Sequence, residues 1–230
     1  MLSIVTINRN NVEGLRKTIE SLRSQSSQKF QWVFIDGAST DASVALGSEF
    51  ARAQDVCISE PDLGIYNAMN KGILHATKDS ILFLNSGDIF VDTKAIASIE
   101  GAISENWDLV LFGFSVRNRI RMPKPIWSRF WSLPTSHQAI IYKRSLLVEH
   151  SFFESYQYAA DFEHFLRITT KPLKIDSVKQ LLICNEPYGS DANLDRVLGE
   201  YRAALVLNGY PSWLAFLIYR FKRFYLGLVL

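Results

Sequence analysis

Acidic side chains follow three of the apolar segments in the first half of the sequence. If these segments are parallel strands, their carboxyl ends share one edge of a sheet, where ligands bind in open α/β folds. An acidic rim of this kind would favour a cation, although each residue taken singly also suits a turn. The segments are 31–35, 55–59 and 81–84, and the acidic residues that follow them are Asp36, then Glu60 and Asp62, and then Asp88.

Asp88 has the sharpest setting, because a hydrophobic segment leads into a short polar loop that ends in this one carboxylate. Mg²⁺ and Mn²⁺ take hard oxygen ligands and often use only one or two protein carboxylates, with substrate phosphates and water completing the shell. A metal-bridged diphosphate therefore suits this rim better than a bare one. There is no GxGxxG after the first apolar segment and no GxxxxGK[ST], which argues against a dinucleotide dehydrogenase and a P-loop NTPase.

Strand and helix patterns alternate through the first half of the chain. Val12, Leu15, Ile19 and Leu22 recur at helical spacing, with Asn10 or Asn11 as the N-cap. This alternation predicts right-handed βαβ units and a mostly parallel sheet. The expected strands are 2–7, 31–35, 55–59, 80–84 and 108–114, and the later expected helices are 42–53, 65–76 and 93–105.

The second half is less regular. Basic residues, prolines and aromatic residues mix without a period in 117–134, which predicts an irregular segment over the sheet. The remaining expected elements are a strand at 138–142, a helix over 162–169, a strand pair at 173–175 and 180–184, and a helix at 191–207. We expect one domain over residues 1–210, with an appendage over 211–230.

The composition limits the class of protein. The 230 residues are 48% hydrophobic, and 25 basic against 23 acidic residues give a net charge of +2. The chain can bury one sizeable core, and its charge does not make nucleic acid an expected partner. Cys57 and Cys184 lie far apart in the sequence, so we expect neither a disulfide framework nor a structural zinc site. Two free thiols of this kind are typical of a protein in a reducing cytoplasm. The N-terminus lacks a basic n-region and is better interpreted as a first strand than as a signal peptide.

The C-terminal residues 211–230 mix aromatic and basic side chains. An amphipathic helix here would suit the headgroup region of a membrane surface, and it would equally suit packing on the core or in an oligomer interface. Arg220, Lys222 and Arg223 interrupt the apolar sequence, so we do not expect the helix to span a bilayer.

Six segments, taken together and in order, resemble the glycosyltransferases of family 2. The resemblance covers roughly residues 1–185 and implies the GT-A fold, an α/β architecture with a Rossmann-like central sheet flanked by helices. The subgroup it resembles most builds bacterial exopolysaccharide, capsule or lipopolysaccharide. The matching segments are 3–8, 35–41, 59–72, 83–88, 136–139 and 160–167.

The resemblance implies a role for each matching residue. Asp161 matches the general base, and Asp88 matches the last position of the DXD-like metal motif. Two alternatives stay open: Asp161 as the N-cap of its helix, with Glu163 as the base, and His137 as a structural residue. The implied donor-binding residues are Thr6, Ile7 and Asn8 at the base, Asp36 at the base or ribose, Glu60, Asp62, Asn67 and Lys71 beside the nucleotide and sugar, Asn85, Ser86 and Gly87 in the metal-motif loop, and His137 and Gln138 at the sugar or diphosphate.

The chain departs from the family pattern at two positions. Many relatives carry Asp at the position of Gly87, so metal binding would depend on one carboxylate and the donor phosphates. Relatives often carry Asp at the position of Asn67, where this chain offers an amide without a charge.

The implied function is inverting, metal-assisted transfer of a sugar from a UDP-, GDP- or dTDP-sugar to a saccharide or lipid-linked saccharide acceptor, in bacterial surface polysaccharide synthesis. The enzyme would be cytoplasmic and peripheral on the inner face of the plasma membrane. One alternative is a sugar-nucleotide-binding partner subunit without turnover. Another is a nucleotidyltransferase, against which Asn8-Arg9-Asn10-Asn11 counts, because that class should carry a Gly-rich basic loop there.

Overall fold

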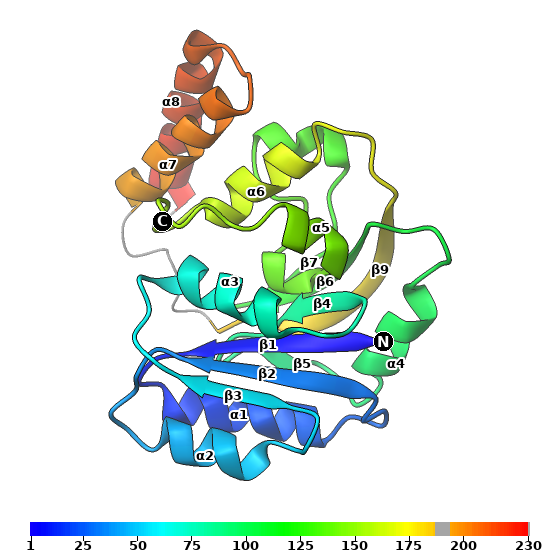
Figure 1. The fold of residues 1–230 in the computed structure, drawn as a ribbon. Helices are drawn as coiled ribbons and strands as arrows, with labels where there is room; N and C mark the ends of the chain where they lie inside the picture. Colours follow the sequence, from blue (N-terminus) through cyan, green and yellow to red (C-terminus); the bar gives the residue numbers. More distant parts are fainter. Residues whose placement is uncertain (187–193, 230) are drawn as a thin grey trace.

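The computed structural model describes residues 1–186 and 194–229 (Figure 1). Within these residues nine strands form one sheet in the order β3-β2-β1-β4-β8-β6-β9-β5, and β7 pairs with β6. The strands are β1 (Leu2–Asn8), β2 (Phe30–Asp36), β3 (Val56–Ser59), β4 (Ser80–Phe83), β5 (Ile89–Phe90), β6 (Leu109–Val116), β7 (Arg119–Arg121), β8 (Ile140–Lys143) and β9 (Ile175–Cys184).

The alternation of strand and helix patterns in the sequence correctly predicts the parallel half of the sheet. Strands β1 to β4 are all parallel, whereas β8 is antiparallel to both β4 and β6, so the sheet as a whole is mixed. The predicted strand pair at 173–175 and 180–184 is wrong, since β9 is one continuous strand beside β6. Its middle residues are polar because they lie largely exposed, and this exposure interrupts the apolar pattern without interrupting the strand.

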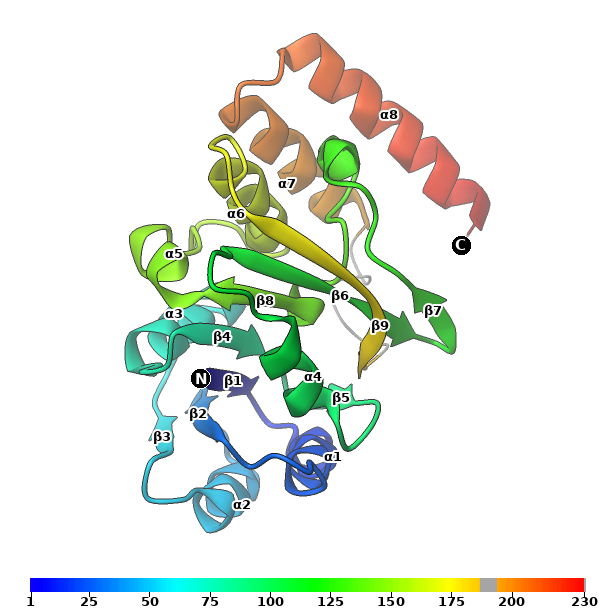
Figure 2. The same ribbon diagram turned by 90° about the vertical axis from the view of Figure 1, so that its right-hand side faces the viewer.

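Helices cover both faces of the sheet, with α1 and α2 on one face and α3 and α6 on the other (Figures 1 and 2). The alternation of β1 explains this, because Leu2 and Ile4 join one apolar core and Val5 and Ile7 join the other. The helices are α1 (Val12–Arg23), α2 (Ser43–Phe50), α3 (Ile65–His75), α4 (Ala95–Ala102), α5 (Arg144–Glu149), α6 (Ala160–Ile168), α7 (Leu194–Leu207) and α8 (Ser212–Val229), with short 3₁₀ helices at Ile126–Phe130 and His137–Ala139.

The C-terminal helices α7 and α8 project together from one end of the molecule (Figure 1). A third apolar cluster joins them to α6 through Phe162, Leu205 and Ala215. Lys222 of α8 donates a hydrogen bond to the Trp131 carbonyl at 2.7 Å, and its burial lowers its pKa to about 7. One side of α8 is therefore packed on the protein. The first residues of the helix expected at 191–207 lie outside the described residues.

The buried imidazole of His164 should make the fold sensitive to acid. It packs on the ring of Phe152 at 4.7 Å, and burial lowers its pKa from 6.5 to about 3. The unfolded chain binds this proton more readily than the folded protein does. The contribution of neutral His164 to the free energy of unfolding is therefore fully present above pH 6.5, and it falls by about 1.4 kcal/mol per pH unit between pH 6.5 and the folded pKa. We expect His164→Phe to remove this part of the acid sensitivity, measured by urea unfolding at pH 7.5 and pH 4.5. An equal loss of stability in both proteins between these pH values would contradict the assignment.

Candidate functional site

Two adjoining cavities open at the carboxyl edge of the parallel strands, and both are lined by Asn11, Ile65, Asn85 and Ser86. The larger, here called the Asp161 cavity, has a volume of about 400 Å³. The smaller, here called the Asn8 cavity, has a volume of about 340 Å³. The Asp161 cavity is also lined by Tyr66, Asp88, Leu133, Ser136, His137, Gln138, Gln157, Tyr158, Asp161 and Glu186. The Asn8 cavity is also lined by Ile7, Asn8, Arg9, Asp62, Gly64 and Ala68.

The loop that carries Asp88 is fixed by helix α1. The Thr18 hydroxyl accepts a hydrogen bond from the Gly87 amide at 3.0 Å and donates to the Asp88 carbonyl at 2.9 Å. Asn11, one of the two residues predicted as the N-cap, caps α1: its side-chain oxygen accepts a hydrogen bond from the Gly14 amide. The helix therefore positions the loop through hydrogen bonds to its backbone.

Asp88 lies at the wall of the Asp161 cavity and is only 4% exposed. Its Oδ1 accepts hydrogen bonds from the Glu186 amide at 2.9 Å and from Asn185 Nδ2 at 3.2 Å. Burial raises the pKa of Asp88 to about 6, although these hydrogen bonds and one from Gln138 oppose the rise. Such a carboxylate gains most from a nearby cation, which would replace the lost solvation.

The residues around Asp88 fit a divalent cation. Asn85 Oδ1, Ser86 Oγ and Asn185 Oδ1 are buried and have no hydrogen-bond partner within the described part of the chain. These are hard oxygen donors of the kind that Mg²⁺ and Mn²⁺ use. No group of three or more His, Cys, Asp and Glu residues that could hold a metal occurs among the described residues. Substrate oxygens would therefore have to complete the coordination.

Asp161 lines the same cavity from the first turn of α6. Its Oδ1 accepts hydrogen bonds from the Tyr66 hydroxyl at 3.2 Å and from the Phe162 amide at 2.9 Å. Burial and the Asp161 carboxylate raise the pKa of Tyr66 well above its usual value, so that hydroxyl remains a donor. The N-cap of α6 is Ala159, so the alternative that Asp161 caps the helix is wrong.

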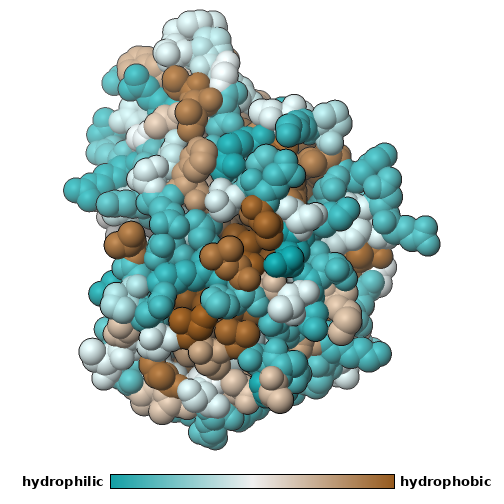
Figure 3. All heavy atoms as spheres, in the orientation of Figure 1, coloured by the Kyte–Doolittle hydropathy of each residue, from teal (hydrophilic) through white to brown (hydrophobic). Residues whose placement is uncertain are grey.

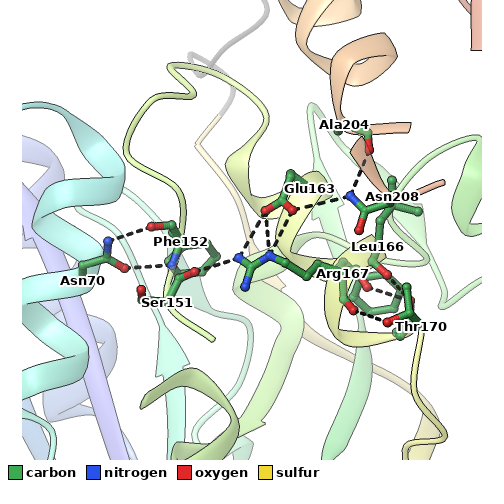
Figure 4. Close-up of polar contacts among 11 residues, drawn as sticks. Asn70, Ser151, Phe152, Glu163, Leu166, Arg167, Thr170, Ala204 and Asn208 are labelled. Atoms are coloured by element: carbon green, nitrogen blue, oxygen red, sulfur yellow. Dashed lines mark hydrogen bonds and ion pairs between the residues drawn. The ribbon is translucent and has the colours of Figure 1, made fainter. Parts of the chain in front are cut away.

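Glu163, the alternative base, faces away from both cavities. It is fully buried, and its carboxylate accepts hydrogen bonds from Arg167 at 3.0 and 3.3 Å (Figure 4). Arg167 also donates to the Ser151 carbonyl, and Asn208 of the chain after α7 approaches Glu163 (Figure 4). The pair therefore anchors α6 to its neighbours. Asp161 is the carboxylate of this helix that is open to the cavity.

His137 and Gln138 form one wall of the Asp161 cavity. His137 Nδ1 is buried without a hydrogen-bond partner among the described residues, and burial lowers the pKa of this imidazole. Its ring lies 6.2 Å from that of Phe83. A neutral imidazole with a free ring nitrogen can bind a polar ligand group, and both predicted roles of His137 remain compatible with this position.

Two predicted residues at the base site have side chains outside the lining of both cavities. Thr6 is buried on the α1 side of the sheet, where its hydroxyl accepts a hydrogen bond from the Trp32 indole at 2.9 Å. Asp36 is fully buried and accepts hydrogen bonds from Asn8 at 2.9 Å and Ser59 at 2.8 Å. Hydrogen bonds from Ser39 and Asn8 hold its pKa below the usual value, despite its burial. Asp36 thus fixes Asn8, which does line the smaller cavity.

Three further predicted residues lie beside the cavities without lining them. Lys71 forms an ion pair with Glu60 at 2.7 Å. The Asn67 side chain accepts from the Leu63 amide at 3.2 Å and donates to Glu154 at 2.9 Å. These contacts order the loop before α3, and contact of these side chains with a donor stays a prediction. The structure gathers Ile7, Asn8, Asp62, Asn85, Ser86, Asp88, His137, Gln138 and Asp161 around the two cavities, while Gly87 lines a neighbouring cavity with Glu186.

Several lining residues were not predicted. Tyr66 and Ile65 lie inside the matching segment 59–72. The contact of Tyr66 with Asp161 brings α3 next to α6, and the sequence alone does not indicate this tertiary contact. Asn185 and Glu186 come next to Asp88 because β9 pairs with β5 in the register Cys184 to Ile89. No local sequence signal marks that pairing.

Comparison with known proteins identifies the family. The family model described as Glycosyl transferase family 2 matches residues 3–163. An uncharacterized glycosyltransferase of Mycobacterium tuberculosis (strain ATCC 25618 / H37Rv) is 33% identical over 190 residues, covering 77% of this chain and 72% of the relative. A PGL/p-HBAD biosynthesis glycosyltransferase of Mycobacterium bovis (strain BCG / Pasteur 1173P2) is 26% identical over 198 residues, covering 80% and 76%.

Solved structures share the fold. TarS 1–349 of S. aureus, in complex with UDP-GlcNAc, has a TM-score of 0.69 at 16% identity, covering 95% of this chain and 70% of that one. A mannosyltransferase of Pyrobaculum calidifontis, in complex with GDP-Man and Mn²⁺, has a TM-score of 0.69 at 15% identity, covering 91% and 65%.

The curled central sheet with flanking helices, which these solved glycosyltransferase structures share, is the GT-A fold. The chain belongs to glycosyltransferase family 2 and is a glycosyltransferase.

Proposed function

We propose that the chain transfers a sugar from a nucleoside-diphosphate sugar to a hydroxyl group of a saccharide acceptor, with inversion at the anomeric carbon. The observation that carries this proposal is that Asp88 and Asp161, 73 positions apart in the sequence, line one cavity. That cavity adjoins a second one with room for a nucleoside. The UDP-GlcNAc and GDP-Man complexes of the two structural neighbours support a nucleotide-sugar donor.

In this reaction Asp161 takes the proton from the acceptor hydroxyl as its oxygen bonds to the anomeric carbon. The bond from that carbon to the diphosphate breaks, and its electron pair leaves with the nucleoside diphosphate. The Tyr66 hydroxyl and the Phe162 amide hold the Asp161 carboxylate in place. General-base catalysis of this kind contributes about 10²–10⁴-fold.

A divalent ion, Mn²⁺ or Mg²⁺, would supply positive charge to the leaving diphosphate when bound. Asp88 would hold it together with the free oxygens of Asn85, Ser86 and Asn185. The Mn²⁺ in the mannosyltransferase neighbour supports this part of the proposal.

The test of the proposed function is a screen of UDP-, GDP- and dTDP-sugars with Mn²⁺ or EDTA. We expect slow hydrolysis of one donor that depends on Mn²⁺, and transfer when a saccharide or lipid-linked saccharide acceptor is added. Saturable donor binding without hydrolysis or transfer would favour the sugar-nucleotide-binding subunit instead.

We propose that the acceptor is presented at a membrane surface, in the synthesis of a cell-surface glycan, by an enzyme peripheral on the cytoplasmic side. The name of the M. bovis relative, a PGL/p-HBAD biosynthesis glycosyltransferase, supports a role in a biosynthetic sugar transfer. Residues 117–131 and 208–230 hold eight of the 25 basic residues and none of the 23 acidic ones, which leaves 17 basic against 23 acidic residues elsewhere. The two segments adjoin, since the rings of Trp131 and Phe221 lie 5.8 Å apart.

The outer face of α8 has the pattern of a membrane-surface helix. Its exposed side chains recur every three or four residues, and apolar side chains interrupt the polar surface of the α7–α8 hairpin at the top of Figure 3. Among the described residues, no helix is long and apolar enough to cross a bilayer. The face fits an anionic headgroup layer. It consists of Trp213, Phe216, Leu217, Arg220, Phe221, Phe224 and Tyr225.

We expect the protein to sediment with phosphatidylglycerol-containing vesicles and not with pure phosphatidylcholine. Phe221→Ser with Phe224→Ser should weaken this binding by roughly tenfold or more, because two exposed aromatic rings are lost from the contact. Leu74→Ser, which removes a 73% exposed leucine on α3, is the matched control and should bind as wild type does. Equal sedimentation of wild type and the double variant would refute the membrane contact.

A further inference from the structure

Glu186 occupies the space that Gly87 leaves open. Gly87 has φ +103°, and a Cβ on it would overlap the Oε2 atom of Glu186. A side chain at position 87 would therefore have to displace this carboxylate as well as strain the backbone. The loop before Asp88 therefore packs against the chain that follows β9, and the carboxylate of residue 186 lies beside position 87.

The Glu186 carboxylate is held loosely by the protein. Its side chain is 30% exposed, and its partners are Lys17 at 3.7 Å and Asn11 Nδ2 at 3.5 Å, both at the limit of an interaction. Its backbone, in contrast, is fixed by the 2.9 Å hydrogen bond from its amide to Asp88 Oδ1. A fixed backbone with a carboxylate free to bind is the arrangement expected of a ligand residue.

Glu186 lines the Asp161 cavity together with Asp88, Asn85 and Ser86. Asn185, which is 9% exposed, adds an amide oxygen without a hydrogen-bond partner among the described residues. The surroundings of Asp88 thus bring together two carboxylates and three neutral oxygens from two distant parts of the chain, with Lys17 beside Glu186. Two carboxylates with hard oxygen donors suit a divalent cation.

We propose that Glu186 is the second carboxylate of the divalent-cation site, taking the place of the side chain that Gly87 lacks. The inference rests on the proposed function for the site itself and adds the residue that compensates for Gly87. With Glu186 in this role, the site has a second carboxylate although its loop carries a single Asp.

The test measures Mn²⁺ binding to the full-length protein by electron paramagnetic resonance, with the metal alone. We expect Glu186→Gln to weaken Mn²⁺ binding at least tenfold, since it keeps the shape and the backbone hydrogen bond and removes the charge. Glu20→Gln is the matched control, because Glu20 lines the neighbouring cavity with Gly87 and does not line the Asp161 cavity, and this variant should bind Mn²⁺ within twofold of wild type. Thermal unfolding confirms that each variant is folded.

Binding by Glu186→Gln within twofold of wild type, while Asp88→Asn loses it, would overturn the role of Glu186 and leave the Asp88 site standing. No measurable binding of Mn²⁺ by wild type would overturn this inference too. Sugar transfer that persists in EDTA would then show that the glycosyltransferase proposal holds without the metal, so the two failures are distinguishable.

Discussion

Asp161→Asn should lower the rate of sugar transfer by about 10²–10⁴-fold, because the amide cannot accept the proton of the acceptor hydroxyl. The substitution keeps an oxygen that can accept the hydrogen bonds from Tyr66 and the Phe162 amide. Donor affinity should therefore stay within about twofold of wild type. The measurement is the transfer rate at saturating donor, with donor affinity from calorimetry.

The matched control for this prediction is Glu149→Gln, which neutralises an exposed carboxylate on α5 that does not line the cavity. It should transfer sugar at the wild-type rate. If Asp161→Asn retains near-wild-type transfer, Asp161 is not the base. If it loses donor binding together with transfer, the residue holds the donor and does not act on the acceptor.

Asp88→Asn should remove the part of the transfer rate that depends on the divalent ion, a loss of about 10²–10³-fold. The variant keeps an oxygen to accept from the Glu186 amide and Asn185, so the loop should stay in place. Its remaining rate should be the same in Mn²⁺ and in EDTA. The measurement is the transfer rate as a function of Mn²⁺ concentration.

Asp92→Asn serves as the control for Asp88→Asn, since Asp92 is an exposed carboxylate four residues further along the chain. It should keep the full response to Mn²⁺. A response to Mn²⁺ in Asp88→Asn equal to that of wild type would place the metal elsewhere or remove it from the mechanism.

The parallel half of the fold was predictable because each element there has a clear period. Strand β1 alternates between two cores, and α1 buries Leu15, Ile19 and Leu22 on one side. The short elements β5, β7 and α5 contain two to six residues, which is too few for a period to show. The middle residues of β9 are polar and exposed, so the apolar pattern is interrupted there. For this reason the sequence predicts two strands, 173–175 and 180–184, where the structure has one.

Two candidate site residues could be placed from the sequence. Asp88 follows a strand in one family segment and Asp161 lies in the first turn of a helix in another, and both line the Asp161 cavity. Hydrogen bonding decides the rest. Thr6 and Asp36 stand at predicted positions, yet their side chains bond to Trp32 and to Asn8 inside the protein. Glu186 depends on the register between β5 and β9, which is a tertiary contact without a local pattern.

The most direct test of the central claim, that the two adjoining cavities form one donor site, is a crystal structure with Mn²⁺ and the donor identified by the screen. We expect an anomalous Mn²⁺ peak against the Asp88 carboxylate, with the base in the Asn8 cavity and the sugar facing Asp161. A diphosphate bound instead in the cavity between Lys17 and Cys184, or a metal away from Asp88, would contradict the account.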